Sequence, residues 1–522
     1  MERIKSALRL AFAAAEARLG RLFPPAWNPL LNLGALGFFF YWIVTVSGIY
    51  IYVFFDTGVS QAYSSVEYMT RDQWFAAGVM RSLHRYASDA LVSVMALHLL
   101  REFALDRYRG ARWFSWVSGV PVVVLVYVAG ITGYWLVWDR LAQYVATVSA
   151  EWLDAAGLFG EPIARNFLSP QHLSDRFFSL LVFLHIAVPL VALLLLWVHL
   201  QRIARPRINP PRGLAAGVLA AFLALALVYP AKSQGPADLL SVPTEIGLDW
   251  FYLPLFPVLE RLPGPLTWSA ALAVFAMFVA IPWLPPMRRP KPAAVDLANC
   301  NGCGRCFADC PYNAITMVAR SDGRPFSSEA RVDPALCVSC GICAGACPTA
   351  TPFRRRAGLH PGIDLPERSL AALREAVHAA AARLTARPRI LVFGCDFGPP
   401  LGGLESPQVG VVPLVCSGQL PPSFVDYVLS RDLAEGVVLT GCAEYACHNR
   451  FGNEWAKARM ARARDPHLRE RVPRHRLRIL WAGPLGYGRL RETLDSFARE
   501  LALTADPQPG KRNPSVLETG HA

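Results

Sequence analysis

The sequence predicts a multidomain chain: an all-α transmembrane bundle of six helices, then a small cysteine-rich α+β domain, then a small parallel α/β domain. Three observations predict this order. Of the 522 residues, 53% are hydrophobic and 17% are charged, which indicates a chain partly embedded in a membrane. The long apolar stretches precede residue 286, and all twelve cysteines follow residue 299. After residue 386, short apolar stretches alternate with helical ones.

The membrane region begins after an amphipathic surface helix, which we expect in residues 1–29. Its apolar run is short and is interrupted by Glu16 and Arg18, so it is not read as a signal peptide. Residues 30–286 form the predicted membrane domain. Its six expected spans are 30–55, 77–100, 113–138, 178–200, 213–230 and 266–285.

The basic residues predict the orientation of these spans. The chain has 52 Lys and Arg against 39 Asp and Glu, a net charge of +13. Sixteen of the Lys and Arg residues around the spans fall on the side of the N-terminus, and six fall on the other side. Because cytoplasmic loops carry such an excess, we expect a multi-pass protein of the cytoplasmic membrane, with its N-terminus and everything after residue 286 in the cytoplasm. The charge is therefore not a sign of a nucleic-acid partner.

Two spans carry matched pairs of histidines. His84 and His98 are fourteen residues apart in the second span, as are His185 and His199 in the fourth. Fourteen residues return to nearly the same helix face about 21 Å further along. Both spans run inward, so His84 lies level with His185, and His98 with His199. Facing imidazoles at two levels predict two b-type haems; the alternative is four buried histidines that hydrogen-bond to neighbouring helices.

Glycines in the first and third spans keep the same interval. They are Gly34 and Gly48, and Gly119 and Gly133. Positions without a side chain at two heights allow a flat macrocycle to approach the helix backbone. Close helix packing explains such glycines equally well in isolation, but their register with the histidines favours haem.

Residues 30–285 resemble the cytochrome b of respiratory and photosynthetic cytochrome bc complexes. "GYWLVWDRLAQYVATV" (133–148) is similar to the family's segment after its third helix. "PTEIGLDWFYL" (243–253) is similar to the loop that carries the family's Pro-Glu-Trp-Tyr quinol-site motif. The resemblance implies a cytochrome b-like bundle that binds two b haems and exchanges electrons with quinone.

This resemblance also implies roles for four residues. Arg81 takes the place of a haem-propionate partner. Asp249 replaces the glutamate of the motif and keeps a carboxylate that can accept a quinol proton. Trp250 and Phe251 supply rings beside the quinone head group. The alternative for Asp249 is an ordinary acidic residue in a loop.

Two cysteine motifs follow a Pro- and Arg-rich linker. "CNGCGRCFADCP" (300–311) and "CVSCGICAGACP" (337–348) both read C-x2-C-x2-C-x3-C-P, the pattern of bacterial ferredoxins with two 4Fe–4S clusters. Residues 295–352 therefore resemble a ferredoxin-like α+β domain. In this pattern the fourth cysteine serves the other cluster, so the predicted ligand sets are Cys300, Cys303, Cys306 and Cys347, and Cys337, Cys340, Cys343 and Cys310. Paired zinc sites, the alternative, lack the third cysteine and the trailing proline.

The last domain, residues 386–503, follows a linker and helix (353–385) and precedes a tail (504–522) expected to be disordered. The stretches "RILVF", "VGVVPLV", "GVVLT" and "LRILW" predict parallel strands. Cysteines follow three of these strands, at the edge where sites in parallel sheets gather. Cys395, Cys416, Cys442 and Cys447 are therefore predicted to bind a further cluster, of the 2Fe–2S type. The alternatives are four reduced thiols and covalent haem attachment through "CAEYACH" (442–448).

The motifs "FGCDFG", "VCSG" and "GCAEYACHNRFGN" resemble the delta subunit of methyl-viologen-reducing hydrogenases. This resemblance implies an electron adaptor that serves a cytoplasmic flavin or iron–sulfur oxidoreductase of the heterodisulfide-reductase type. Together the patterns predict the membrane subunit of a quinone-linked oxidoreductase, with quinone or quinol as its substrate. A membrane anchor with an iron–sulfur relay and no quinone site is the alternative. The sequence leaves open whether the chain is itself an enzyme and whether it forms a homodimer.

Overall fold

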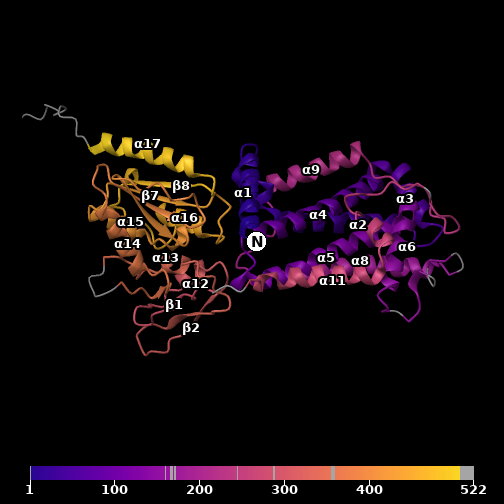
Figure 1. Ribbon diagram of the computed structural model, residues 1–522, viewed down its shortest axis with the longest axis horizontal. Coiled ribbons are helices and arrows are strands. Elements are labelled where there is room, and N and C mark those ends of the chain that lie inside the picture. Colours follow the sequence, from indigo (N-terminus) through magenta and orange to yellow (C-terminus); the bar gives the residue numbers. More distant parts are fainter. Residues whose placement is uncertain are drawn as a thin grey trace, which may run out of the picture. The chain divides into compact units, whose positions relative to one another are not determined.

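The protein is described by a computed structural model, which covers residues 2–505 except 159, 165–167, 170–171, 244, 286–288 and 354–358. It divides into two compact units, residues 1–289 and 290–522. Figure 1 shows helices in the first unit and both helices and strands in the second. Helix α17 (Tyr487–Ala505) continues two residues past residue 503, the predicted end of the last domain. From residue 506 onward, the predicted tail lies outside the described residues.

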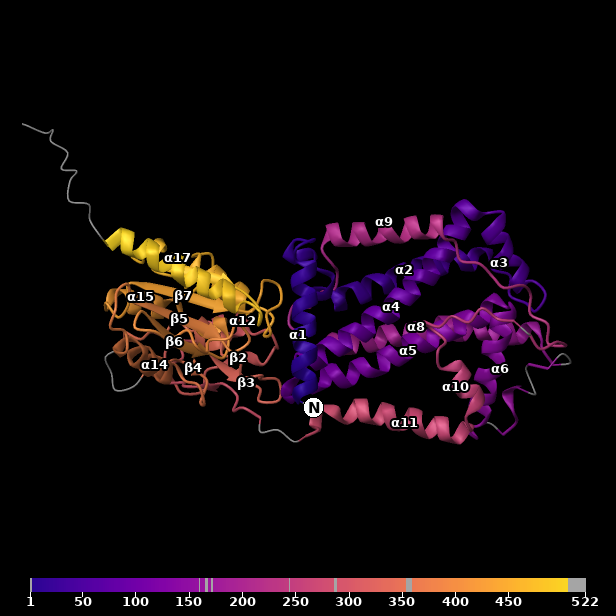
Figure 2. The same cartoon turned by 45° about the horizontal axis from the view of Figure 1, so that its top comes forward.

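Four long helices form the centre of the first unit. They are α2 (Leu33–Phe54), α4 (Val79–Ala104), α5 (Trp113–Val137) and α8 (Asp175–Leu200). Helix α2 packs along α4, α5 packs along α8, and α4 contacts α5, which joins the two pairs. Two further helices, α9 (Arg212–Val228) and α11 (Gly264–Ala280), pack against α4 and α5 from opposite sides (Figure 2).

All six stretches that the sequence predicts to cross the membrane are helical. By length and composition, four helices are suited to crossing it: α2, α5 with its preceding turn, α8 and α11. Helix α4 has 26 residues, but it carries charged side chains, among them Arg85 and Asp89. Helix α9 is apolar but has 17 residues. The structure therefore supports four apolar spans, and the count of six stays a prediction.

The predicted N-terminal helix is present as α1 (Glu2–Leu19) and lies across the C-terminal end of α4 (Figure 1). Lys5 is buried and donates to Asp106 at 2.6 Å, and Glu16 pairs with Arg101 at 2.8 Å. These two ion pairs attach the helix to the end of the bundle where His98 lies.

The connections at the other end of the bundle contain short helices that the sequence analysis does not predict. They are α3 (Ala62–Arg71), α6 (Arg140–Asp154) and α10 (Phe256–Arg261). Helix α6 begins at Asp139, whose carboxylate accepts a hydrogen bond from the Ala142 backbone N–H at 2.8 Å and caps the first turn. Its apolar face joins a core with the ends of α5 and α8.

The second unit begins with small paired elements. Strands β2 (Ile315–Ala319) and β3 (Ser328–Val332) form an antiparallel hairpin, and β1 (Ala294–Val295) pairs with β4 (Ile363–Asp364). Helices α12 (Arg305–Asp309) and α13 (Ile342–Ala346) each carry part of one cysteine motif. Each begins after a glycine with positive φ, Gly304 at 70° and Gly341 at 76°, a conformation that suits glycine.

A four-stranded sheet follows. Its strands are β5 (Ile390–Cys395), β6 (Val409–Leu414), β7 (Gly436–Gly441) and β8 (Leu477–Trp481), in the order β6-β5-β7-β8 and all parallel. Helices α14 (Leu370–Ala382), α15 (Pro422–Ser430) and α16 (Gly452–Met460) contribute to the core on one face, and α17 to the core on the other. The predicted parallel α/β domain is confirmed.

The two cysteine-rich parts of the second unit share one hydrophobic core. Cys306 and Cys343 of the first part belong to the same buried cluster as Leu420, Phe424 and Met460 of the second. Residues 290–505 therefore pack as one body, and the positions of all twelve cysteines relative to one another follow from this packing.

Candidate haem and iron–sulfur sites

The two histidines at the first predicted level face each other. His84 on α4 and His185 on α8 have ring centroids 6.2 Å apart, with the ring planes at 59°. Two metal–imidazole bonds of about 2.0–2.1 Å each, together with the rings themselves, account for roughly this spacing. The pair is thus separated by the distance that an iron between the two rings requires.

Hydrogen bonds to the backbone set which ring nitrogen is available. The Nδ1 atom of His84 lies 2.9 Å from the Val44 carbonyl oxygen, and that of His185 lies 3.1 Å from the Ala129 carbonyl oxygen. A carbonyl only accepts, so Nδ1 is the donor in each case. Nε2 therefore keeps its lone pair and is free to bind a metal.

Each of the four glycines in register with the histidines contacts one imidazole ring. A Cβ atom added to the glycine would lie 3.0–3.5 Å from the ring. The pairs are Gly48 with His84 (3.0 Å), Gly133 with His185 (3.1 Å), Gly119 with His199 (3.2 Å) and Gly34 with His98 (3.5 Å). At Gly48, Gly133 and Gly119 a Cβ atom would therefore press against the histidine ring, whereas at Gly34 it would make an ordinary contact.

A hydroxyl group precedes three of these glycines, which the sequence analysis missed. Ser47, Thr132 and Ser118 each place Oγ 3.1 Å from the Nδ1 of the histidine that their glycine contacts. The recurring Ser/Thr-Gly dipeptide was therefore a usable signal. Leu33 stands in this place before Gly34, so His98 lacks the hydroxyl.

The second level differs in its surroundings. His98 and His199 interact electrostatically with each other and with Glu102, which follows His98 by one turn on α4. Arg101 and Arg107 form ion pairs with Glu102 at 3.8 and 3.5 Å. The second pair therefore lies beside a charged cluster at the end of the bundle that α1 covers.

Arg81, the predicted propionate partner, is hydrogen-bonded to other parts of the chain. Its guanidinium donates to the Thr70 hydroxyl and, at 2.8 Å, to the Ser233 hydroxyl, and it lies 3.9 Å from Glu67. Arg81 stands three residues before His84 in the sequence. The structure places its side chain beside the loops that close this end of the bundle.

Asp249 lies within a network of donors. Its carboxylate pairs with Arg85 and accepts hydrogen bonds from the Tyr134 hydroxyl at 2.5 Å and from the backbone N–H groups of Phe251 and Tyr252 at 2.9 and 3.1 Å. Burial raises its pKa, but these donors outweigh burial and hold the pKa below its usual value. The carboxylate is thus ionised and has reduced basicity.

The partners of Asp249 were not predicted, because Arg85 and Tyr134 come from the second and third spans. Arg85 also pairs with Asp89 on its own helix, so one guanidinium joins two carboxylates. The neighbouring side chains of Trp250 and Phe251 are 69% and 55% exposed, so both rings are accessible at the surface.

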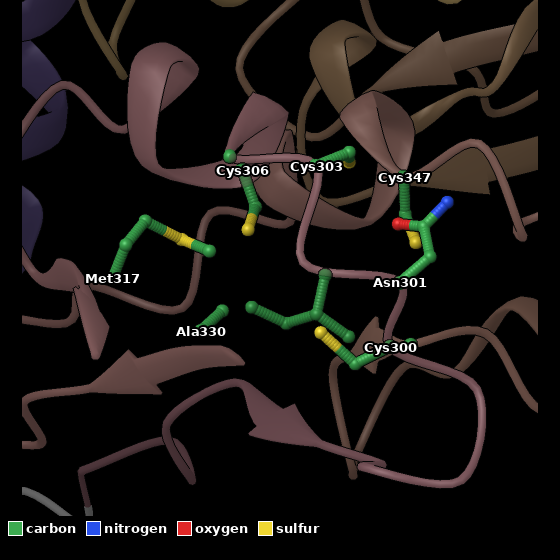
Figure 3. A pocket seen from close by; sticks show the side chains of 10 residues that line it. Cys300, Asn301, Cys303, Cys306, Met317, Ala330 and Cys347 are labelled. Carbon is green, nitrogen blue, oxygen red and sulfur yellow. The ribbon is translucent and has the colours of Figure 1, made fainter. Parts of the chain in front are cut away.

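The first predicted set of ferredoxin-like cysteines lines one pocket. Cys300, Cys303, Cys306 and Cys347 surround it together with Met317 and Ala330. Figure 3 shows the sulfur atoms of Cys300, Cys306 and Cys347 directed into this pocket. Cys347 comes from the distant second motif, so the structure brings together the set that the sequence pattern assigns to one cluster.

The second set lines a separate pocket. Cys310, Cys337, Cys340 and Cys343 surround it, with Ile342 and Tyr312 among the apolar residues of the wall. Here Cys310 comes from the first motif and the other three from the second. The exchange of the fourth cysteine between the motifs therefore appears in both pockets.

Electrostatics within these sets favour a bound cation. Burial, followed by repulsion from the neighbouring thiols, raises the pKa of Cys306 to about 12 and raises that of Cys343 well above its usual value. Such thiols become thiolates only where positive charge compensates them, as iron does. Among the described residues, no three His, Cys, Asp or Glu side chains are arranged to hold one metal ion.

The four remaining cysteines converge at the carboxyl edge of the parallel sheet. The neighbouring thiols of Cys416 and Cys442 lower the pKa of Cys395 to about 4. The same two thiols lower the pKa of Cys447 well below its usual value. The four sulfurs thus form a ring in which two readily ionise, and thiolate is the form that binds iron.

Gly452 makes room for this ring and was not predicted. A Cβ atom at this position would lie 2.2 Å from the sulfur of Cys416 and 3.3 Å from that of Cys447. Only glycine is therefore compatible with the start of α16 at this point. The aromatic rings of Phe397 and His448 stack with centroids 3.6 Å apart. Phe397 lies two residues after Cys395, and His448 directly follows Cys447.

Comparisons with known protein families match the three parts of the chain. The family described as Cytochrome b/b6/petB matches residues 18–206. The 4Fe-4S dicluster domain matches residues 299–351, and the delta subunit of methyl-viologen-reducing hydrogenase matches residues 403–503. All three predicted resemblances are confirmed.

Individual relatives cover mainly the first part. Cytochrome b6 of Porphyra purpurea is 30% identical over 203 residues, which are 38% of this chain and 93% of that protein. Cytochrome b of Acanthamoeba castellanii is 25% identical over 288 residues, which are 49% of this chain and 74% of that protein. A chain of the solved structure "Hyperthermophilic respiratory Complex III" is 17% identical with a TM-score of 0.40, covering 49% of this chain and 75% of the other.

Proposed function

The chain belongs to the cytochrome b family, and from this membership we propose that it is the membrane subunit of a quinone-linked oxidoreductase. Its four apolar helices make it a multi-pass membrane protein, and its three domains are those of a membrane electron-transfer subunit. In the proposal, electrons pass between a membrane quinone or quinol pool and a cytoplasmic redox partner. The observation that carries the proposal is the His84–His185 pair, whose rings are spaced for an iron between them.

The membrane part of the path consists of two b-type haems. His84 and His185 hold one of them, and His98 and His199 hold the other, each through Nε2. The haem irons supply reversible one-electron transfer. The hydrogen bonds to Nδ1 orient the imidazoles and fix their tautomer, and the facing glycines allow each ring to reach its position. With the six predicted spans, the two pairs of histidines would hold the haems near opposite membrane surfaces.

The cytoplasmic part consists of two 4Fe–4S clusters and one 2Fe–2S cluster. The ligand sets are the three groups of four cysteines described above. Cys340, a ligand of the second 4Fe–4S cluster, packs against the buried group that contains Ile342 and Cys416, a ligand of the last cluster. If both clusters are bound, this contact would bring their ligands close enough across the shared core for electrons to pass between them.

The quinone site lies at the outer end of the bundle. Asp249 takes up the quinol proton, and Trp250 and Phe251 flank the quinone ring. Arg81 would hold a propionate of the haem bound by His84 and His185. Arg85 connects this site to the haem because it follows His84 directly and pairs with Asp249. The excess of basic residues on the N-terminal side supports this orientation in the cytoplasmic membrane.

The partner docks on residues 386–503 and is a cytoplasmic flavin or iron–sulfur oxidoreductase of the heterodisulfide-reductase type. The match to the hydrogenase delta subunit supports this assignment. Oxidation or reduction of a soluble substrate takes place on that partner. The chain contributes only the electron path and the quinone chemistry.

One observation favours a second candidate, a membrane anchor with an iron–sulfur relay and no quinone site of its own. The Asp249 carboxylate already accepts four donors, two from side chains and two from the backbone, as a structural carboxylate does. Redox titration of the purified protein with and without added quinone separates the two candidates. Quinone-dependent oxidation of the haems supports the oxidoreductase, and haems that respond only to artificial donors support the anchor.

A further inference from the structure

Arg459 is a fully buried cation between two of the proposed clusters. It lies on α16 of the C-terminal domain and its side chain has no exposed surface. It pairs with Asp309, the residue before Cys310, and donates from Nη1 to the Gly418 carbonyl at 3.1 Å. Since Gly418 follows Cys416 by two residues, one guanidinium connects loops that carry ligands of two different clusters.

The guanidinium also lies against the helix that carries Cys343. A Cβ atom on Gly345 of α13 would lie 3.0 Å from Nη1 of Arg459 and 2.1 Å from the Gly418 carbonyl oxygen. Gly345 thus allows α13 and Arg459 to come together.

The Nε atom of Arg459 is buried and forms no hydrogen bond with any of the described residues. An unsatisfied N–H of this kind is costly in a protein interior, more so in a charged group. Cluster sulfides and cysteine sulfurs are acceptors, and hydrogen bonds to them are one of the factors that set the reduction potential of a cluster.

We propose that Arg459 donates its Nε–H to a sulfur of the cluster bound by Cys310, Cys337, Cys340 and Cys343, and that it raises the reduction potential of this cluster. Reduction adds one negative charge to the cluster, and a nearby cation and N–H donor stabilise the charged form. The C-terminal domain therefore adjusts the reduction potential of the cluster that exchanges electrons with the cluster of this domain. This inference rests on the proposed function only for the presence of that cluster.

The test is an EPR-monitored redox titration of the purified full-length protein, with the cluster identified by the signal that Cys340→Ser removes. Arg459→Gln should lower the midpoint potential of this cluster by about 59 mV. For a one-electron couple, this shift changes the ratio of reduced to oxidised cluster about tenfold. Asp309→Asn should raise the potential, because it removes a negative charge and leaves the cation. The cluster bound by Cys300, Cys303, Cys306 and Cys347 should change less in both variants.

Arg464→Gln is the matched control, because Arg464 also pairs with Asp309 but is 25% exposed. An unchanged potential in Arg459→Gln at full iron content, or an equal shift in Arg464→Gln, overturns the proposal. If Arg459→Gln alone does not fold, it is introduced together with Asp309→Asn, which leaves no unpaired buried carboxylate. The midpoint potential of the cluster should then be lower in the double variant than in Asp309→Asn alone. Equal midpoint potentials in these two variants overturn the proposal. The midpoint potentials of the clusters do not depend on whether the protein reacts with quinone, so this test is separate from the test of the proposed function.

Discussion

The imidazole rings of His84 and His185 face each other with their centroids 6.2 Å apart, and each ring donates from Nδ1 to a carbonyl of a neighbouring helix. Two imidazole rings joined directly by a hydrogen bond would have their centroids closer together than this. Two rings that merely satisfied their own hydrogen bonds would have no reason to lie opposite each other at this spacing. The arrangement therefore accounts for the costly placement of histidine within apolar spans.

Histidine variants test the two haem sites separately. The purified protein should contain two low-spin b-type haems with bis-imidazole spectra. His84→Ala or His185→Ala should remove one haem, and His98→Ala or His199→Ala should remove the other, so each variant retains about half of the haem. Pyridine haemochrome analysis gives the content. A single haem in the wild type, or loss of both in every variant, contradicts the pairing.

Glycine variants test whether the backbone admits the histidine rings. A Cβ atom on Gly48 would lie 3.0 Å from the His84 ring, but on Gly34 it would lie 3.5 Å from the His98 ring, an ordinary contact. Gly48→Ala should therefore shift or broaden the low-spin EPR signal of one haem, and Gly34→Ala should change the spectrum much less. Gly217→Ala serves as control, because nothing lies within 4 Å of that position. Equal effects of all three substitutions would falsify this account.

Iron analysis tests the thiol sites. Anaerobic preparations should contain roughly ten irons in clusters, from two 4Fe–4S centres and one 2Fe–2S centre. Cys416→Ser should remove only the smaller cluster. Gly452→Ala should have the same effect without removing a ligand, because its Cβ would displace the Cys416 sulfur, whereas Gly488→Ala on α17 should be silent. Cluster iron near eight in the wild type, unchanged in Cys416→Ser, shows instead that the last four cysteines are structural.

Asp249→Asn tests the outer quinone site. The substitution keeps the shape and removes the base, so quinone-linked haem oxidation or reduction should slow by about 10²–10⁴-fold, with haem spectra and cluster content unchanged. Asp238→Asn, in the same loop, is the matched control and should react at the wild-type rate. If Asp249→Asn reacts at the wild-type rate, the proton route lies elsewhere and the anchor hypothesis gains support.

The pH dependence of this effect follows from the lowered pKa of Asp249. A carboxyl group with a folded-state pKa below its usual value is ionised throughout the range from pH 6 to 8. The ratio of wild-type to Asp249→Asn rates should therefore stay constant across this range. The contribution of Asp249 to stability is present above its unfolded pKa and is lost as the pH falls through its folded pKa. A rate ratio that changes tenfold between pH 6 and 8 contradicts this assignment.

The sequence predicted the elements whose signal is a fixed interval. The fourteen-residue spacing of the histidines and the C-x2-C-x2-C-x3-C-P motifs reflect helix geometry and cluster size. The structure accordingly brings His84 to His185, and Cys347 into the pocket lined by Cys300. The four strands of the C-terminal sheet were also predicted, because short apolar runs between turn residues mark buried parallel strands.

Contacts between residues that no regular spacing in the sequence links could not be predicted. Tyr134 and Arg85 reach Asp249 from different helices, and Arg459 reaches Asp309 across 150 positions. Gly452 was missed for a different reason: its role depends on where the Cys416 sulfur lies after folding. The short loop helices were missed because their caps, such as Asp139 before α6, look like ordinary loop residues.

The most direct test of the central claim, a continuous path from the clusters through both haems to quinone, is a rapid-mixing experiment on the full-length protein in lipid nanodiscs. The protein is fully reduced, mixed anaerobically with quinone, and followed by haem absorbance and cluster EPR. We expect oxidation of the haems followed by the clusters. In His98→Ala the clusters should stay reduced while the remaining haem is oxidised. Clusters that are oxidised as fast in His98→Ala as in the wild type, or haems that quinone does not oxidise, would contradict this claim.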